Sequence, residues 1–300
     1  MSHDSPHPVH IDGRPATTGD LAPLAFAGHA HFTAMQLRDG RVRGLDLQLE
    51  RLRSASVELF GRALPEDVVR AHLRTALAAA PTADLSLTAA VSSTAGEFTG
   101  ADGDLTLLIR TGPPSSGPDG PLALAAVEHE RFLPHVKHVG EVAKTHLLRQ
   151  AAAEGFDDAA FLDREGRFSE ATIWNLVFWD GESVVWPEAR ILTGTTLGIV
   201  RRQLDALGIG QRTAPVTPDD LPALAGAAVM NSWTPGTPVH RIGPTGLPAA
   251  PRFLEALHRA YAAEPPVAPG RARRAVRSGL SPRTRRSPSA AGPCRSAGRG

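Results

Sequence analysis

A proline- and glycine-rich segment near the middle of the chain limits what this sequence can fold into. The segment GPPSSGPDGP runs from Gly112 to Pro121. Proline removes a backbone donor and glycine adds conformational freedom, so neither a helix nor a strand can continue through such a stretch. We therefore expect residues 113–121 to be a linker that divides the chain into two domains.

Before the linker, the sequence predicts a small α+β domain over residues 21–112, after a loose N-terminal segment of residues 1–20 that contains a short extended piece around residues 9–13. Apolar residues spaced for strands surround the turn-favouring pair Asp39-Gly40, which predicts a hairpin. Two amphipathic helices and two further strands should follow. The helices are expected at residues 45–60 and 65–79, and the strands at residues 84–91 and 105–111.

After the linker, strands dominate the pattern and helices are interspersed among them. We expect a large, β-rich domain over residues 122–263, so the fold class is α+β in two domains. The expected strands are residues 122–130, 159–163, 175–179, 184–186 and 227–231, and the expected helices are residues 141–153, a helix that opens after Gly194, and residues 252–262.

Composition restricts the partners and the compartment. Residues 264–300 are rich in Arg and Pro and poor in large apolar residues, so we expect a disordered tail. Its arginines could touch nucleic acid, but the chain's net charge of +1 gives no case for nucleic acid or membrane as the main partner. The single cysteine, Cys294, leaves no disulfide framework and indicates a cytoplasmic protein.

Lysine is scarce in this chain. Of the 32 Lys and Arg residues, only Lys137 and Lys144 are lysine. Arginine stays protonated at working pH, whereas a lysine amine can lose its proton and form a Schiff base. Composition alone leaves two interpretations open: a reactive amine, or two solvated surface lysines.

The sequence from His135 to Leu204 resembles the core of the class IV, fold-type IV pyridoxal-phosphate enzymes. The matching features are a lysine shortly before a helix, the stretch GFDDA before a strand, the series Gly, then Ser-Glu, then Asn, and Leu-x-Gly followed by two small residues and a helix. The resemblance extends from about Phe32 to Val239. The family includes branched-chain and D-amino acid aminotransferases and aminodeoxychorismate lyase. It implies a small N-terminal α/β domain and a larger C-terminal β-rich pseudo-barrel.

By this resemblance, Lys137 is the catalytic lysine that holds pyridoxal 5'-phosphate as a Schiff base and moves the substrate proton. Glu170 matches the glutamate that pairs with the pyridine nitrogen and keeps the ring protonated. Lys144 lies about two helical turns beyond Lys137 and could share its face, although we favour a surface lysine. No metal is implied.

The resemblance also implies a phosphate site. Arg51 matches the arginine that reaches the cofactor phosphate from the small domain. The turn before the helix at Thr195 and Thr196 offers backbone N–H groups and the Thr196 hydroxyl to the anion. Ser232 and Trp233 would supply a second turn against the same phosphate.

Several positions depart from the family pattern. The aminotransferase branch has a tyrosine five residues after the lysine, where this chain has Val142, and the lyase branch also lacks it. Leu197 replaces an arginine and Gln48 replaces a histidine. No residue matches those that bind a substrate carboxylate. His29, His31 and Gln36 could face the pocket from the early hairpin, although we favour a structural or exposed role for each histidine.

The sequence therefore predicts an aminotransferase that acts on an amino acid and 2-oxo acid pair, as a homodimer. Elimination of the aminodeoxychorismate lyase type, with an amino-chorismate substrate, remains the alternative. A protein of another class, a catalytically silent binding protein that kept the fold, is motivated by Val142, Leu197 and Gln48. The coexistence of Lys137, Glu170 and Arg51 argues against it.

Overall fold

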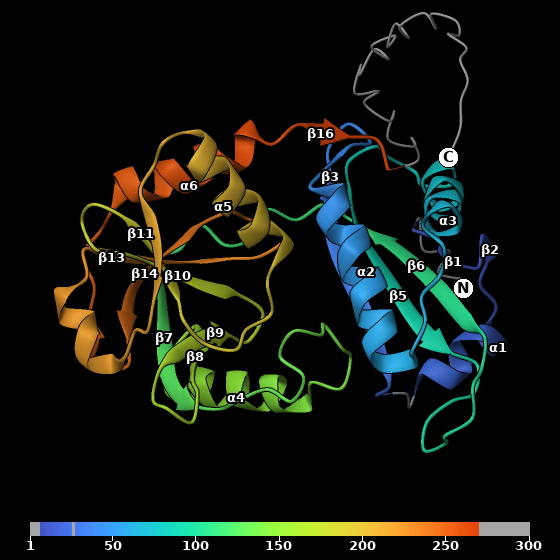
Figure 1. The fold of residues 1–300 in the computed structure, drawn as a ribbon, viewed down its shortest axis with the longest axis horizontal. Helices are drawn as coiled ribbons and strands as arrows, with labels where there is room; N and C mark the ends of the chain where they lie inside the picture. The colour runs from blue at the N-terminus through green and yellow to red at the C-terminus, as the bar shows by residue number, and fades with distance from the viewer. Residues whose placement is uncertain (1–6, 26–27, 270–300) are drawn as a thin grey trace, which may run out of the picture.

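The two halves of the chain build separate sheets in the computed structural model, which describes residues 7–25 and 28–269 (Figure 1). Residues 113–121 contain neither helix nor strand and lead from one sheet to the other. Gly117 and Gly120 have φ angles of 77° and 78° there, values that favour glycine. None of the helices in the described ranges is both long enough and apolar enough to cross a membrane.

The small lobe contains an antiparallel sheet of five strands in the order β2-β1-β6-β5-β3. Its elements are β1 (Val9–Ile11), β2 (Arg14–Pro15), α1 (Thr18–Leu21), the 3-10 helix η1 (Ala22–Ala25), β3 (Ala30–Leu37), β4 (Val42–Arg43), α2 (Leu45–Phe60), α3 (Glu66–Ala78), β5 (Leu85–Ser93) and β6 (Leu105–Gly112). The extended piece expected around residues 9–13 forms β1, an inner strand of this sheet between β2 and β6.

The predicted hairpin forms only in part. Asp39 and Gly40 make the turn with φ angles of 51° and 65°, and Arg38 bridges to Arg41. Beyond that bridge, β3 pairs with β5 instead of the returning strand, over eight residue pairs. The returning strand β4 is short because α2 begins at Leu45, so it cannot extend the hairpin.

Alternation along β3 gives its two faces different roles. Met35 and Leu37 point into one core cluster with residues of α2, α3, β5 and β6, so both helices cover the same face of the sheet. Phe32 and Ala34 point to the opposite face and line a cavity described below. The period of two along this strand therefore separates a stabilising face from a face available to a ligand.

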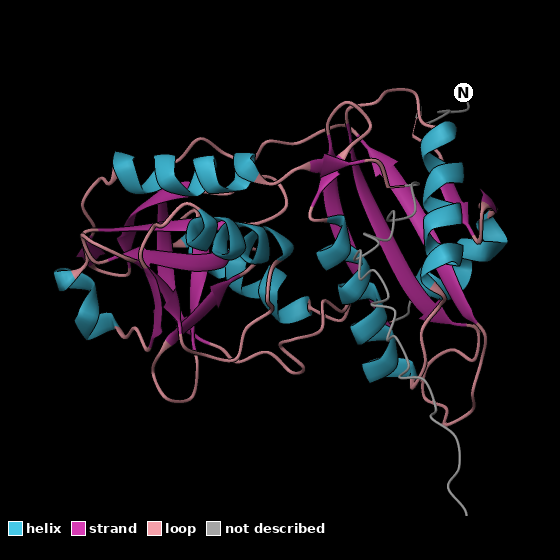
Figure 2. Cartoon of the chain, turned by 45° about the horizontal axis from the view of Figure 1, so that its top comes forward, coloured by secondary structure: helices cyan, strands magenta, loops and turns pink. Residues whose placement is uncertain are grey.

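The large lobe is a barrel-like sheet with helices on its outside (Figure 2). Its elements are β7 (Leu122–Glu128), α4 (Val142–Ala153), β8 (Asp158–Leu162), β9 (Phe168–Ala171), β10 (Asn175–Trp179), β11 (Val184–Pro187), α5 (Thr195–Ala206), β12 (Gln211–Ala214), the 3-10 helix η2 (Pro218–Ala223), β13 (Gly226–Met230), β14 (Thr237–Ile242), β15 (Thr245–Gly246) and α6 (Pro251–Ala263). A last short strand, β16 (Pro266–Val267), follows α6.

The barrel closes where β9 meets β10. Neighbouring pairings run β10-β13-β14-β7-β8-β9, and Glu170 of β9 then pairs with Asn175 of β10. Leu176 and Phe178 fill the interior, whereas Val177 between them packs outward against α5 and α6. Glu170 and Asn175 are therefore fixed at the closure of a rigid sheet.

The end of the described chain returns to the small lobe. β16 pairs with β4, and Arg70 of α3 donates to the carbonyl of Pro269 at 3.2 Å. Residues 264–269, which the sequence assigns to the tail, are thus bound to the small lobe, and residues 270–300 lie outside the described residues.

Arg202 of α5 adds an ionic link at the same place. It contacts Asp46 of α2 at 2.8 Å and Glu264, which follows α6. Because these partners come from both lobes, the link holds the lobes together.

Candidate active site

Between the two lobes lies a cavity of about 230 Å³, and all seven site residues predicted from the sequence line it. These residues are Arg51, Lys137, Glu170, Thr195, Thr196, Ser232 and Trp233. Other cavities of about 380, 560 and 730 Å³ are lined by none of the seven. The structure therefore brings together residues that lie as far as 182 positions apart in the sequence (from Arg51 to Trp233).

Lys137 is positioned by the edge of the small sheet. The backbone N–H of Phe32 donates to the carbonyl of Lys137 at 2.8 Å, and Val139 donates to the carbonyl of Ala30 at 2.9 Å. Through these bonds, the segment that carries Lys137 lies against β3 as a further strand-like partner from the other lobe. The Lys137 ammonium lies 4.9 Å from the centre of the Phe32 ring.

The surroundings of Lys137 favour its neutral form. Burial, together with the positive charges of Arg51 and Lys144, lowers the pKa of the Lys137 amine to about 7. A free lysine has a pKa of about 10.4, so this amine is neutral far more often at physiological pH. A neutral amine is what a nucleophile or a general base requires.

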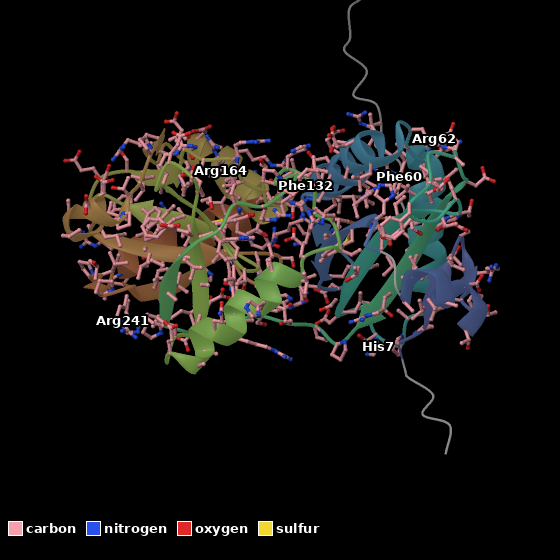
Figure 3. All side chains as sticks on the ribbon, turned by 90° about the horizontal axis from the view of Figure 1, so that it is seen from below. His7, Phe60, Arg62, Phe132, Arg164 and Arg241 are labelled. Carbon is pink, nitrogen blue, oxygen red and sulfur yellow. The ribbon has the colours of Figure 1, made fainter. Side chains whose placement is uncertain are left out.

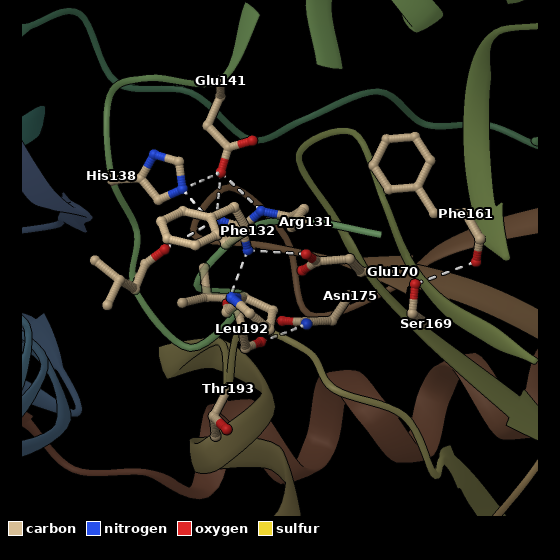
Figure 4. A network of polar contacts seen from close by, with 12 residues as sticks. Arg131, Phe132, His138, Glu141, Phe161, Ser169, Glu170, Asn175, Leu192 and Thr193 are labelled. Atoms are coloured by element: carbon tan, nitrogen blue, oxygen red, sulfur yellow. Dashed lines mark hydrogen bonds and ion pairs between the residues drawn. The ribbon is translucent and has the colours of Figure 1, made fainter. Parts of the chain in front are cut away.

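Glu170 belongs to a buried network centred on Arg131, and Figure 4 shows its bonds. Arg131 donates to Glu170 at 2.9 Å and to Glu141 at 2.7 Å. It also donates to the carbonyls of Pro134 and Val136, each at 2.9 Å. Arg131 is 6% exposed and Glu170 is 4% exposed, so this pair is shielded from water. The network fixes both the carboxylate and the loop that carries Lys137.

A second group of donors surrounds the first turn of α5. No side chain caps this helix at Gly194, so its first N–H groups are available to a ligand. Arg51 donates to the carbonyl of Thr193 at 2.8 Å, and burial lowers its pKa to about 10, which leaves it charged at neutral pH. A charged guanidinium beside an uncapped helix N-terminus suits an anion.

The two threonines at this turn are already engaged through their hydroxyls. Thr195 accepts from the Gln48 side chain at 3.0 Å, which links α2 to α5. The Thr196 hydroxyl donates to the carbonyl of Asn231 at 2.7 Å. The role of the Thr196 hydroxyl toward the phosphate stays a prediction, and the backbone N–H groups of the turn are further donors.

Ser232 and Trp233 lie in the turn that follows β13. The Trp233 N–H donates to the side chain of Asn231 at 2.8 Å, and the Trp233 ring meets Trp174 edge to face at 5.7 Å. Because Asn231 also accepts from Thr196, this turn and the start of α5 form one unit.

Several residues that line the cavity were not predicted from the sequence, and three of them, Lys144, Asn175 and Phe32, bear on the site. Lys144, interpreted there as a surface lysine, lines the cavity, so that interpretation is corrected. Asn175 also lines the cavity and donates to the carbonyl of Leu192 at 2.8 Å. Phe32 carries the contact with Lys137. The position of Lys144 two turns beyond Lys137 was the one available signal. Arg131, just outside the cavity lining, was also missed, because its ion pair with Glu170 joins residues 39 positions apart and no local pattern marks such a pair.

Other candidates lie away from the cavity. His31 is buried against Ser56 at 2.8 Å, Gln36 bonds Ser86 at 2.8 Å, and His29 lies beside Phe60. Their structural surroundings agree with the role favoured from the sequence for the two histidines. Val142, at the position of the family tyrosine, is 83% exposed, and Leu197 lies on the buried face of α5.

Comparison with known proteins gives a family and a fold. The family model for class IV amino-transferases matches residues 30–242. No curated protein matches the chain by sequence.

Solved structures are similar across most of the chain. The branched-chain aminotransferase from Thermoproteus uzoniensis, solved with norvaline, is 20% identical with a TM-score of 0.74, covering 84% of this chain and 93% of that one. The branched-chain amino acid aminotransferase from Thermobaculum terrenum, solved in its PLP form, is 16% identical with a TM-score of 0.73, covering 86% and 94%. A putative 4-amino-4-deoxychorismate lyase from Legionella pneumophila is 18% identical with a TM-score of 0.69, covering 77% and 89%.

These similarities agree with the two-lobed α+β architecture and with the resemblance seen in the sequence. At such identities the structures establish the fold, and the family model, which spans more than half of the chain, establishes the family. This chain is an enzyme that belongs to the class IV aminotransferase family.

Proposed function

We propose that this protein is a pyridoxal-phosphate-dependent aminotransferase that acts on an amino acid and 2-oxo acid pair, with Lys137 forming the Schiff base to the cofactor. The observation that supports this most strongly is the shared cavity of Lys137, Glu170 and Arg51. A reactive amine, a carboxylate and an anion-binding arginine are the three groups that pyridoxal phosphate requires. The similar enzyme from Thermobaculum terrenum was solved in its PLP form, which agrees with this cofactor.

The residues present fit the cofactor at both of its ends. The uncapped start of α5 and Arg51 offer donors and charge to a phosphate. Gly194 lets this turn pack closely against Asn175, since a Cβ there would lie 2.0 Å from the Asn175 side-chain oxygen. At the other end, Arg131 holds Glu170 ready to accept from a protonated ring nitrogen. When bound, pyridoxal phosphate supplies an electron sink for the substrate α-carbon.

The protein supplies the proton transfers. Lys137 Nζ is the group placed to remove the proton from the substrate α-carbon and to return it, because its lowered pKa lets it accept and release a proton near neutrality. Glu170 and Arg131 stay fixed during this transfer. Phe32, Ile173 and Trp174 give one side of the cavity an apolar lining.

The test is spectroscopic. Purified protein mixed with pyridoxal phosphate should develop a visible absorption band, and Lys137→Ala should lack it. A panel of L- and D-amino acids should then convert the bound cofactor to the pyridoxamine form in the wild type. A wild-type protein that binds no cofactor would refute the proposal. Lys144→Ala serves as a matched lysine control, and it should keep the band.

A lyase reaction is the second candidate. The similarity to the putative 4-amino-4-deoxychorismate lyase and the valine at position 142 favour it. Elimination would release pyruvate from aminodeoxychorismate without converting the cofactor to its pyridoxamine form. Measuring both products in one reaction separates the two activities.

We also propose a homodimer in the cytoplasm. Apolar side chains stand exposed on the loop that carries Lys137, including Phe132 at 81%, labelled near the junction of the lobes in Figure 3. Val139 on the same loop and Val142 at the start of α4 are exposed too. Sedimentation of wild type and Phe132→Asp tests the dimer.

A further inference from the structure

The second lysine of the chain has no assigned role, although it faces the same cavity as the first. Lys144 is the third residue of α4 and lines the cavity together with Lys137, Glu170 and Phe32. It is partly buried, and burial lowers the pKa of its amine. A lysine placed there carries a desolvation cost that an exposed lysine avoids.

The acidic groups around Lys144 are already bonded to other partners. Glu170 and Glu141 both accept from Arg131. Asp158 accepts from the Thr172 hydroxyl at 2.7 Å and from the Trp174 ring N–H at 2.9 Å. Within the described residues, the Lys144 side chain forms neither an ion pair nor a hydrogen bond, although these carboxylates and Arg131 act on it electrostatically. Its three donors are therefore available to a ligand in the cavity.

Three cationic side chains line this cavity: Arg51, Lys137 and Lys144. The side chain of Arg51, which belongs to α2, reaches the start of α5, where the phosphate site is proposed. Lys137 is the proposed attachment point of the cofactor. Lys144 comes from α4, a different element, and is the one remaining cation among the described residues that line the cavity. An amino acid or 2-oxo acid brings a second anionic group, its carboxylate, which needs a cationic or polar partner when it leaves water.

We propose that Lys144 binds the carboxylate of the amino acid or 2-oxo acid substrate. This inference rests on the proposed function, because it assumes that the cofactor occupies Lys137 and Arg51. Lys144 then selects acids over amines that lack a carboxylate. It is a binding residue that touches the substrate, and Lys137 remains the residue that moves the proton.

The test measures binding without turnover. The protein loaded with pyridoxal phosphate is titrated with 4-methylpentanoate and, separately, with the neutral amide of the same acid. The fluorescence of Trp174 and Trp233, which line the cavity, reports binding. Four proteins are compared: wild type, Lys144→Met, Lys144→Arg and Arg149→Met. The last removes an exposed charge from the same helix.

Losing a charged hydrogen-bond partner should raise the Kd for the carboxylate in Lys144→Met by roughly 10- to 100-fold. The Kd for the amide should stay unchanged. Lys144→Arg should keep most of the affinity because the charge is retained, and Arg149→Met should behave as wild type. The KM for the amino-acid substrate should rise in Lys144→Met while kcat changes less.

Two results would overturn the assignment: an unchanged Kd for the carboxylate in Lys144→Met, or an equal loss for the carboxylate and the amide. The second result would mean that the lysine shapes the cavity or the cofactor and does not select the acid. If wild type develops no absorption band with pyridoxal phosphate, the proposed function fails and this inference fails with it. A normal band together with either of the two results above refutes Lys144 alone.

Discussion

At the scale of single residues, Arg131 determines the geometry of the site without lining the cavity. It joins Glu170 of β9 to Glu141, which precedes α4, and it binds two carbonyls of the loop before Lys137. A buried guanidinium with this many partners replaces the water that two carboxylates would otherwise need. The lysine and the glutamate are therefore held by one side chain.

Removing Arg131 should leave Glu170 as an unpaired buried charge. We expect Arg131→Ala to lower the free energy of unfolding by about 3–5 kcal/mol, measured by urea denaturation. Pyridoxal phosphate should bind more weakly to any folded fraction, as measured by the visible band. Arg164→Ala is the control, because Arg164 is exposed and its contact with Glu130 is 3.9 Å. A stable Arg131→Ala protein would contradict this account of the network.

His31 gives a prediction for pH. It is fully buried beside Ser56, and burial lowers its pKa to about 4. An unfolded histidine titrates near 6.5, so between about pH 6.5 and pH 4 the unfolded chain binds a proton that the folded protein does not. The free energy of unfolding should therefore decrease as the pH is lowered from about 6.5 to about 4, by about 3 kcal/mol over the whole range. Above about pH 6.5 it should not depend on the protonation of His31.

Urea unfolding at pH 7 and pH 4.5 measures this effect. The difference between the two pH values should be smaller by roughly 2 kcal/mol in His31→Gln than in wild type. His135→Gln, which changes an exposed histidine, should show the wild-type difference. Equal differences in all three proteins would argue against a neutral, buried His31.

At the scale of elements, the site depends on three junctions between elements. The Lys137 segment adds to the edge of β3, β9 meets β10 at Glu170 and Asn175, and the start of α5 lies against the turn after β13. Each junction is made mainly by backbone hydrogen bonds or by bonds to a carbonyl, so it fixes position closely. The functional side chains are carried on these junctions and not on free loops.

Gly194 is where one of these junctions is most crowded. In Gly194→Ala the new Cβ would meet the Asn175 oxygen at 2.0 Å, so Asn175 or the first turn of α5 must move. Overpacking of this kind costs about 1–3 kcal/mol, and we expect weaker binding of pyridoxal phosphate in titrations followed at the visible band. Gly246→Ala is the control, because a Cβ at that residue would have no other atom within 4 Å. Unchanged cofactor affinity in Gly194→Ala would show that this turn does not hold the phosphate.

At the scale of the whole molecule, the cavity exists because two lobes are held against each other. Gln48 reaches Thr195 from the small lobe, and Arg51 reaches Thr193. Away from the cavity, Arg202 contacts Asp46 and Glu264, and β16 pairs with β4. The last described residues thus strengthen an interface on which the site depends.

Two truncations test this interface. A chain that ends after Pro269 keeps β16 and the Arg202 partners, so we expect wild-type cofactor affinity and stability. A chain that ends after Ala263 loses Glu264 and β16, and we expect it to unfold at lower urea with a loss of about 1–3 kcal/mol, because several buried or half-buried polar contacts are removed. Equal behaviour of the two proteins would show that residues 264–269 do not stabilise the lobes.

The local sequence determined those parts of the molecule that need only short-range information. The helix over residues 45–60 and the strand over residues 175–179 begin and end as predicted, because periodicity and turn residues fix them locally. β9, at residues 168–171, was not predicted, since four wholly buried residues that include Glu170 show no alternation. The seven proposed site residues came from motif order, and the structure places all of them at one cavity.

Tertiary structure alone decided which of the remaining polar groups have partners. Arg131 meets Glu170 across 39 positions and Arg202 meets Asp46 across 156, so no local pattern encodes these pairs. Lys144 looked like a surface lysine because a helical period cannot say what the helix faces. Burial and charge compensation depend on the whole fold, and they are the reason that this second lysine is available to bind a ligand.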